Sequence, residues 1–303
     1  MIRHVMPHTD LNISCLCLGT MTYGKPVSDM DAIILTHRAM ANGINFIDTA
    51  NMYEGYARFL GSPGGVAEEI LGKALADRRD QVILATKVGM KIGPADDDQG
   101  LSRKHVQREI DRSLVRLNTT YIDLYYMHKP DPNTPMGESA QAFNDLVTDG
   151  KVRYWGVSNF SADQMSELLL ICDQNGWRRP VAVQPAYSYL KRDIEKDLLP
   201  LCQKEQISVI PYQVLQGGLL TGKYHRNEPI PVNSRQLEKP EWTMPLNDEM
   251  HDKLETCEKE ARLLGRGILQ HALLSLLEKP LVLSLIVGVK SVEQLDNLIS
   301  AVG

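Results

Sequence analysis

Four residues that can carry acid–base chemistry stand close to the ends of apolar runs in the first half of the chain. Asp48 follows one such run, and Tyr53 lies in the short polar segment beyond it. Lys87 and His128 each stand directly after a further apolar run. Together, a phenol could donate a proton, an ammonium could stabilise a developing alkoxide and an imidazole could orient a substrate oxygen. The set therefore predicts protonation of a carbonyl oxygen.

The chemistry also predicts what the four residues need from one another. A free tyrosine has a pKa of about 10, and we expect the Lys87 ammonium to lower the pKa of Tyr53. A carboxylate at Asp48 would keep Lys87 charged and in place. A carbonyl polarised in this way accepts hydride, but none of these side chains can supply one. A cofactor is therefore required.

Each of the four residues also has an ordinary structural interpretation. Asp48 could cap a helix, Tyr53 could be a surface tyrosine, Lys87 could be solvated and His128 could be packed in the core. Their shared position at successive strand ends favours the functional interpretation.

The rest of the chain alternates segments of strand and helix character. Apolar runs predict strands at 15–20, 44–48, 82–86, 121–127, 152–157, 181–184, 207–210 and 281–287. Apolar periodicity and capping residues predict helices at 28–42, 66–76, 102–117, 135–148, 161–174, 193–204, 248–264, 267–278 and 291–301. We expect a short β-hairpin over 2–13 and an extended connection over 217–247, between the seventh and eighth strands.

Eight strand–helix units predict a parallel sheet closed into a single (β/α)8 TIM barrel domain over residues 1–303. The alternative is an open doubly wound sheet, which would carry a Gly-x-Gly-x-x-Gly turn after its first strand. The segment 19–24 does not fit that pattern, and neither a P-loop nor a His-Glu-x-x-His zinc motif is present. In a barrel, the active site lies at the carboxyl ends of the strands. These ends carry Gly19, Thr20, Asp48, Lys87, His128, Ser158, Asn159, Gln184, Tyr212 and Gly288.

Composition excludes several classes of protein. The net charge of −5 and the pI of about 5.9 argue against a nucleic-acid partner, which needs a basic surface. No apolar stretch is long enough to cross a membrane, and the first residues lack a signal-peptide pattern. The five cysteines include no Cys-x-x-Cys pair, so we expect all of them to be reduced in a cytoplasmic protein.

Several motifs together resemble the aldo-keto reductase superfamily. They are Phe-Ile-Asp-Thr-Ala-x-x-Tyr at 46–53, Ala-Thr-Lys at 85–87, Asp-Leu-Tyr-Tyr-Met-His at 123–128, Gly-Val-Ser-Asn-Phe at 156–160, Gly-Gly-Leu-Leu-Thr-Gly-Lys-Tyr at 217–224 and Glu-Gln-Leu-Asp-Asn at 293–297. The resemblance implies a nicotinamide cofactor bound without a Rossmann domain. It also implies that Tyr53 is the general acid, that Lys87 and Asp48 tune it, and that His128 orients the carbonyl of a small-molecule substrate.

The resemblance extends to cofactor contacts. It places Ser158, Asn159 and Gln184 at the nicotinamide carboxamide and Tyr212 against the nicotinamide ring. It places the remaining contacts along the dinucleotide: Gly19, Thr20, Met21 and Asp48 at the first strand ends, Leu215, Gly217 and Leu219 at the pyrophosphate, and Gly288, Lys290, Gln294 and Asn297 at the adenosine end. A lysine at 290 suits a 2′-phosphate, which favours NADPH/NADP+ over NADH. Lys290 could instead be an ordinary solvated lysine.

Three positions depart from the family pattern: Glu54 after the tyrosine, Gln213 after the stacking aromatic and Val287 before Gly288. Two other functions remain open, a nucleotide-binding regulatory subunit with little turnover and a lyase or isomerase that uses Lys87 as a Schiff base. Position alone marks five residues as candidate substrate contacts: Tyr23, Met52, Tyr56, Met90 and Lys129.

Overall fold

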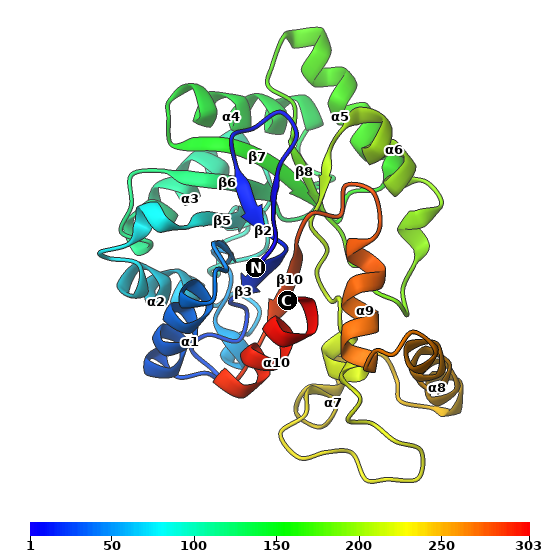
Figure 1. Ribbon diagram of the computed structural model, residues 1–303. Coiled ribbons are helices and arrows are strands. Elements are labelled where there is room, and N and C mark those ends of the chain that lie inside the picture. Colours follow the sequence, from blue (N-terminus) through cyan, green and yellow to red (C-terminus); the bar gives the residue numbers. More distant parts are fainter.

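An eight-stranded parallel sheet forms the centre of the molecule (Figure 1). The computed structural model describes residues 1–303. The sheet strands are β3 (Leu16–Gly19), β4 (Phe46–Asp48), β5 (Ile83–Val88), β6 (Ile122–Met127), β7 (Val152–Ser158), β8 (Ala182–Gln184), β9 (Ser208–Val209) and β10 (Leu285–Gly288). They pair in chain order from β3 to β9, and β10 returns to pair with β3. The strands are almost wholly apolar because both faces of the sheet are buried.

Contacts between β9 and β10, the two edge strands of this order, close the sheet. Val209 forms a parallel bridge with Val282, and the Leu283 amide donates to the Val209 carbonyl at 3.3 Å. The Ile286 amide donates to the Pro211 carbonyl at 3.0 Å. The (β/α)8 barrel predicted from the sequence is therefore confirmed.

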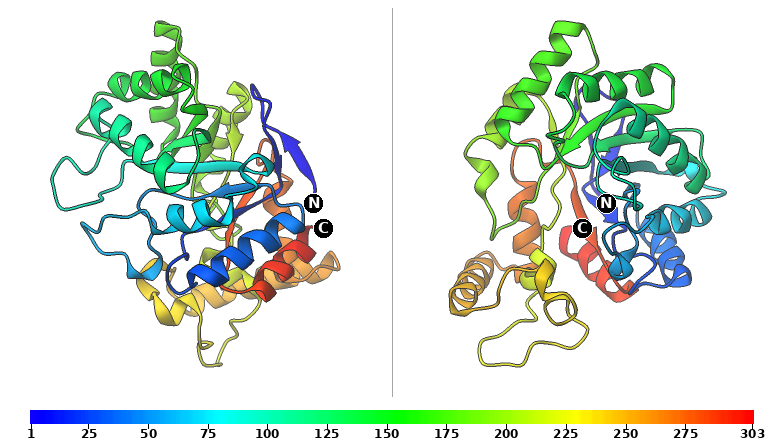
Figure 2. Two further views of the ribbon diagram at one scale, coloured as in Figure 1. Left: turned by 90° about the vertical axis from the view of Figure 1, so that its left-hand side faces the viewer. Right: turned by 180° about the vertical axis from the view of Figure 1, so that it is seen from behind.

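Most of the helices cover the outside of the sheet (Figure 2). The helices are α1 (Asp29–Ala41), α2 (Val66–Ala74), α3 (Arg103–Arg116), α4 (Met136–Thr148), α5 (Ala162–Asn175), α6 (Leu198–Glu205), α7 (Arg235–Glu238), α8 (Asp248–Leu263), α9 (Ile268–Leu277) and α10 (Val292–Val302). Of these, α7 and α8 lie beyond the barrel (Figure 1). The short 3-10 turns are Gly55–Ala57, Arg79–Gln81, Asp193–Glu195, Gln216–Thr221 and Pro240–Trp242. No helix is long and apolar enough to cross a membrane.

Two predicted segments differ from the structure. The helix expected over 193–204 is divided into the turn Asp193–Glu195 and α6, which begins at Leu198 and has Pro200 in its first turn. Pro200 has no amide proton to donate to the carbonyl of Lys196, so one helix does not run on from the turn into α6. The connection expected as a loop over 217–247 contains α7 and two 3-10 turns. This connection extends beyond the barrel beside α8, where Figure 1 shows it in yellow.

The amino ends of the strands are closed by the predicted hairpin, formed by β1 (Arg3–Val5) and β2 (Asn12–Ser14). Its residues Met6, Leu11 and Ile13 belong to the apolar cluster inside the barrel. A larger cluster of 53 buried residues lies between the strands and the helices. All five cysteines are buried and none forms a disulfide.

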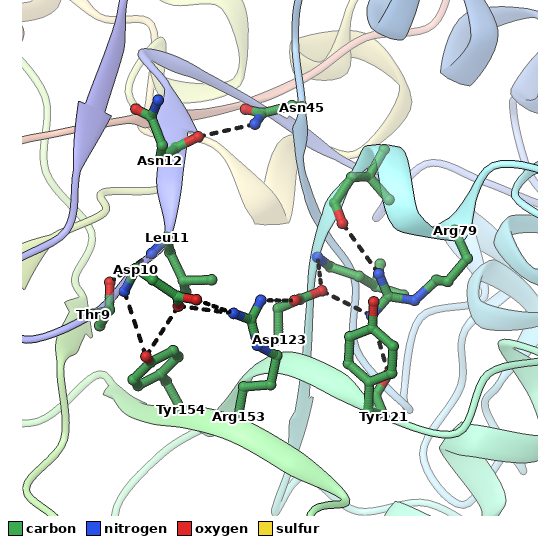
Figure 3. Close-up of polar contacts among 12 residues, drawn as sticks. Thr9, Asp10, Leu11, Asn12, Asn45, Arg79, Tyr121, Asp123, Arg153 and Tyr154 are labelled. Carbon is green, nitrogen blue, oxygen red and sulfur yellow. Dashed lines mark hydrogen bonds and ion pairs between the residues drawn. The ribbon is translucent and has the colours of Figure 1, made fainter.

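A polar network ties the hairpin to the barrel (Figure 3). The buried Asp123 on β6 accepts from Arg79 at 2.8 Å, from Arg153 at 2.7 Å and from the Leu84 amide at 2.9 Å. Arg153 also donates to both carboxylate oxygens of Asp10 in the hairpin turn. A polar network at this end of a barrel serves stability, since active sites lie at the opposite end.

Candidate active site

The Lys87 ammonium is the centre of the candidate site. Its side chain is fully buried, and it donates to Asp48 Oδ1 at 2.5 Å, to the Thr49 carbonyl at 2.8 Å and to Tyr53 Oη at 3.2 Å. An ammonium has three N–H donors, so each of them has an acceptor. Lys87 is thereby held in one orientation, with the phenol of Tyr53 as one of its partners.

Strand register brings these residues together. Asp48 ends β4 and pairs with Ala85 on β5, and Lys87 lies two residues beyond Ala85 on the same face. A tight turn then returns the chain, because the Tyr53 amide donates to the Ala50 carbonyl at 3.0 Å. The first turn of α2 holds the other side of Tyr53, since the Ala67 amide donates to the Tyr53 carbonyl at 3.0 Å.

His128 follows β6 and faces the same phenol. Its ring meets the Tyr53 ring edge-on, with centroids 6.0 Å apart and an interplanar angle of 80°. The His128 amide is fixed by the Val88 carbonyl at 2.8 Å, while the imidazole Nδ1 is buried without a partner. The structure thus brings together all four residues of the predicted acid–base set.

The electrostatics of the set differ from the prediction at Tyr53. Burial raises the pKa of Tyr53 above its ordinary value, and the Lys87 ammonium opposes this without overcoming it. Lys87 thus acts on the pKa of Tyr53 in the predicted direction, but the net lowering is not found, because desolvation of the phenolate outweighs the ammonium and the Asp48 charge adds to it. The phenol stays protonated at neutral pH, as a proton donor must.

The other three groups also have shifted pKa values. Burial favours neutral Lys87, but Asp48 and Tyr53 together outweigh it and raise the pKa of Lys87. Burial raises the pKa of Asp48, against the effects of Lys87 and Gln184. Burial lowers the pKa of His128 well below its ordinary value, and the charges of Lys87, Lys129 and Arg58 add to this. The imidazole is therefore neutral at neutral pH and can share a hydrogen bond with a substrate oxygen.

The amide and hydroxyl groups predicted to bind the carboxamide form one connected network. Gln184 Nε2 donates to Asp48 Oδ2 at 2.9 Å, and Ser158 Oγ donates to the Gln184 carbonyl at 2.8 Å. Asn159 Nδ2 lies 3.1 Å from Ser158 Oγ, and Tyr212 Oη donates to Asn159 Oδ1 at 2.7 Å. Amide and hydroxyl groups of this kind match the donors and acceptors of a carboxamide.

A group of cations is formed by Lys290, which follows β10, and by Lys223 and Arg235 of the long connection between β9 and α8. Lys223 is partly buried and has no hydrogen bond or ion pair. Burial lowers its pKa, and Lys290 and Arg235 lower it further, while Glu238 opposes them. A partly buried ammonium surrounded by other cations favours an anion, and phosphate groups of a dinucleotide fit this requirement. Sequence reasoning assigned no role to Lys223 or Arg235, although Lys223 stands within the motif at 217–224.

Lys290 is held by the same long connection. Its ammonium forms a 2.7 Å ion pair with Glu238 on α7 and donates to the Asn233 carbonyl at 2.5 Å. Its own amide donates to Gln294 Oε1 at 2.9 Å, at the start of α10. Gly288, Gln294 and Asn297 are exposed at this end of the barrel.

The turn at 216–221 supplies backbone groups more than side chains. Gly217 and Gly218 have φ angles of 67° and 100°, a conformation that glycine adopts without strain. Leu215 is partly buried, and Leu219 is 1% exposed within a small apolar cluster that includes α8 residues. Contact between Leu219 and a cofactor would therefore involve its backbone.

The residues at the first strand end lie against Asp48. Gly19 pairs with Asp48 in the sheet, and Thr20 Oγ1 donates to the Asp48 carbonyl at 3.1 Å. Met21 is partly exposed beside them in the chain. The carboxyl end of β3 therefore lies directly beside Asp48 of the acid–base set.

The five candidate substrate contacts have different surroundings. Tyr23 is fully buried, and its hydroxyl lies 2.9 Å from Thr36 Oγ1 on α1. Its proposed contact with substrate is therefore wrong, because the turn after β3 directs this ring into the core. Met52 and Met90 are partly buried, and Lys129 is exposed.

Tyr56, which follows Tyr53 in the chain, contacts the long connection between β9 and α8. Its ring packs edge-on against Trp242 at 5.5 Å, and Arg235 Nε donates to its hydroxyl at 3.3 Å. Arg235 and Trp242 belong to the long connection between β9 and α8. That connection is therefore attached both to the segment after Tyr53 and, through Lys290, to the end of β10.

Comparisons with known proteins agree with this geometry. The aldo/keto reductase family model matches residues 15–302. An oxidoreductase of Bacillus subtilis is 35% identical over 97% of this chain and 89% of its own length. A protein of Schizosaccharomyces pombe named as a potassium channel beta subunit is also 35% identical, over 96% of this chain and 85% of its own. The structure of a glycerol dehydrogenase from Gluconobacter oxydans superposes with a TM-score of 0.82, at 29% identity, over 99% of this chain and 90% of its own.

Proposed function

Because this chain belongs to the aldo/keto reductase family, we propose that it reduces an aldehyde or ketone to an alcohol with NADPH, using Tyr53 as the general acid. The single observation that supports this most is that the Lys87 ammonium donates all three of its hydrogen bonds, to Asp48, to the Thr49 carbonyl and to Tyr53. Such a group stabilises negative charge that develops on the phenol oxygen as its proton leaves.

The roles of the residues follow from their contacts. A bound nicotinamide supplies the hydride. The substrate carbonyl oxygen lies between Tyr53 and His128, and Tyr53 donates its proton to that oxygen. Neutral His128 orients the oxygen with a hydrogen bond, and Asp48 keeps Lys87 charged. In the reverse direction, the same phenol receives the proton of the alcohol.

The cofactor-binding residues divide according to the part of the dinucleotide that they would hold. Ser158, Asn159 and Gln184, which are linked by hydrogen bonds, would hold the carboxamide, and Tyr212 would hold the ring. Gly19, Thr20 and Met21, together with the backbone of Leu215, Gly217 and Leu219, would hold the middle of the dinucleotide. Gly288, Gln294 and Asn297 would hold the adenosine end.

The preference for NADPH comes from positive charge. Lys290, Lys223 and Arg235 lie close enough to influence one another, with Glu238 as their anionic neighbour. NADPH carries one phosphate more than NADH, so this surplus of cations favours NADPH. In this proposal Lys290 would bind the 2′-phosphate.

A second function has one observation in its favour, the relative named as a potassium channel beta subunit. A regulatory subunit would bind the nucleotide with little turnover. Turnover therefore separates the two functions. The lyase alternative requires a neutral lysine as nucleophile, whereas the pKa of Lys87 is raised and its three donors are engaged.

The test is a panel of aldehydes and ketones with NADPH, followed by identification of the alcohol product. We expect cofactor oxidation that matches alcohol formed, mole for mole. Tight NADPH binding without turnover of any carbonyl would replace the reductase with the regulatory function. A lysine adduct trapped by borohydride with a carbonyl substrate would support the lyase.

A further inference from the structure

Two carboxylates are completely buried outside the barrel, behind the acid–base set. Glu68 on α2 and Glu109 on α3 both have no exposed surface. Buried carboxylates are costly unless they are paired, so residues of this kind have specific partners. Glu68 has the shorter contacts, and they lead directly to the strand of Lys87.

Glu68 connects β5 to two helices. Its Oε1 accepts from Thr86 Oγ1 at 2.6 Å, and its Oε2 accepts from Arg116 Nε at 2.7 Å. Arg116 belongs to the last turn of α3 and lies against Gly65, where a β-carbon would be 2.5 Å from its Cδ. Both carboxylate oxygens are therefore occupied, and the negative charge is paired.

Thr86 immediately precedes Lys87. Side chains alternate along a strand, so Thr86 faces the helices while Lys87 faces the barrel interior. Thr86 is fully buried, and Glu68 is its hydrogen-bond acceptor. The position of Lys87 along β5 is thus fixed from the helix side through its neighbour.

The adjacent residue of α2 holds the general acid. The Ala67 amide donates to the Tyr53 carbonyl at 3.0 Å, and Glu68 follows Ala67 in the chain. Two consecutive residues of α2 therefore have different tasks: Ala67 holds the backbone of Tyr53, and Glu68 holds β5 beside Lys87. Both attachments help to set the 3.2 Å distance between Lys87 Nζ and Tyr53 Oη.

We propose that Glu68 is a positioning residue for the proton donor, acting through Thr86 to hold Lys87 at Tyr53. Glu109 makes a weaker contact with the segment between Asp48 and Tyr53, since its Oε2 accepts from Asn51 Nδ2 at 3.4 Å. Its charge is paired with Arg108 and Arg112. The catalytic part of this inference rests on the proposed function, whereas the positioning part concerns the free protein alone.

The decisive change is Thr86→Val, which removes the hydroxyl with little change of shape. We expect kcat to fall roughly tenfold, since misplacement of a reacting group by about 1 Å can cost about a hundredfold. KM and NADPH affinity should not change, because Thr86 touches neither ligand. Thr86→Ser keeps the hydroxyl and should restore kcat.

The matched control is Thr36→Val on α1. Thr36 is equally buried, and its hydroxyl contacts Tyr23 away from the acid–base set. This variant loses a buried hydroxyl in the same way but should leave kcat unchanged. An equal fall of kcat in Thr36→Val would mean that Thr86 acts through general stability, and this would overturn the proposal.

A readout without substrate separates this inference from the proposed function. NMR of ring-labelled tyrosine can follow the ionisation of Tyr53, with Tyr53→Phe identifying its signal. The titratable groups that face Tyr53 are Lys87, Asp48, Cys17, His128 and Tyr212. If Lys87 recedes in Thr86→Val, the phenolate loses its nearest cation and the pKa of Tyr53 rises further.

The Tyr53 titration still tests the proposal if Thr86→Val does not fold, because a second variant changes the same contact. Glu68→Asp keeps the charge for Arg116 but shortens the reach to Thr86, so it should also raise the pKa of Tyr53. An unchanged Tyr53 titration in a folded Thr86→Val or Glu68→Asp protein would overturn the proposal. This holds whether or not the wild-type protein reduces any carbonyl, so the two claims fail separately.

Discussion

At the residue scale, burial determines the charge of each group in the site. Lys87 stays charged because it has Asp48 beside it, whereas the charges that act on His128 are all positive. Tyr53 stays protonated because burial disfavours its phenolate. One buried ion pair thus lies beside a neutral phenol and a neutral imidazole. This combination suits donation of a proton to a carbonyl oxygen.

His128 gives a prediction for the pH dependence of stability. Its pKa is lowered in the folded state, so below its ordinary pKa of about 6.5 the unfolded chain binds more protons than the folded one. Stability contributed at neutral pH is therefore lost as the pH falls through about 6.5. Urea unfolding at about pH 8 and about pH 5.5 should show a larger loss for the wild type than for His128→Gln. Equal losses would contradict a neutral, buried His128.

The sequence predicted some residues of the site and not others, for physical reasons. Asp48, Lys87 and His128 stand at ends of apolar runs, and strand ends converge in a barrel. Tyr23 also follows a strand, but the direction of a loop side chain depends on packing, here against Thr36. Glu68 lies on the buried face of a helix. The apolar periodicity of this helix does not show that Glu68 is buried with its charge paired, because its partners Thr86 and Arg116 belong to other elements.

At the element scale, the long connection between β9 and α8 is attached at two places. Arg235 contacts Tyr56, and Glu238 pairs with Lys290. Composition predicted a loop here, and no local pattern indicated α7 or these distant partners. The eight strand–helix units were predictable because each has its own apolar pattern, whereas the connection depends on contacts between residues far apart in the sequence.

The Glu238–Lys290 pair gives a prediction for cofactor affinity. If Lys290 binds the 2′-phosphate, Glu238 competes with that phosphate for the same ammonium. Glu238→Gln should then tighten NADPH binding by roughly three- to fivefold, which corresponds to about 0.7–1 kcal/mol for a partly exposed pair. NADH binding should not change. Fluorescence titration with both cofactors measures this.

Lys290→Ala is the companion variant. It should weaken NADPH binding and leave NADH binding unaltered, since NADH has no 2′-phosphate. Equal weakening of both cofactors would place Lys290 at a part that they share. An unchanged NADPH affinity in both variants would remove the 2′-phosphate from this position.

At the scale of the whole molecule, stability and chemistry lie at opposite ends of the barrel. The hairpin and the Asp123 network close the amino ends of the strands (Figure 3), and the acid–base set lies at the carboxyl ends. Changes at one end should therefore leave the other unaltered.

Two aspartates of this network test the separation. Asp123 is buried with three donors, so Asp123→Ala should cost about 3–5 kcal/mol, because Arg79 loses its ion pair, Arg153 keeps only Asp10 and the Leu84 amide loses its acceptor. Asp10 is exposed, so Asp10→Ala should cost about 0–1 kcal/mol. Urea unfolding measures both values. Folded protein of either variant should keep wild-type kcat, and a changed kcat would argue against the separation.

The most direct test of the central claim is the transfer of hydride to a carbonyl in Tyr53→Phe, measured in a single turnover with NADPH already bound. The variant lacks only the phenolic hydroxyl, so NADPH affinity should equal that of the wild type. Reduction should slow by about a hundredfold or more, the usual contribution of a general acid. Reduction at nearly the wild-type rate would show that Tyr53 is not the proton donor.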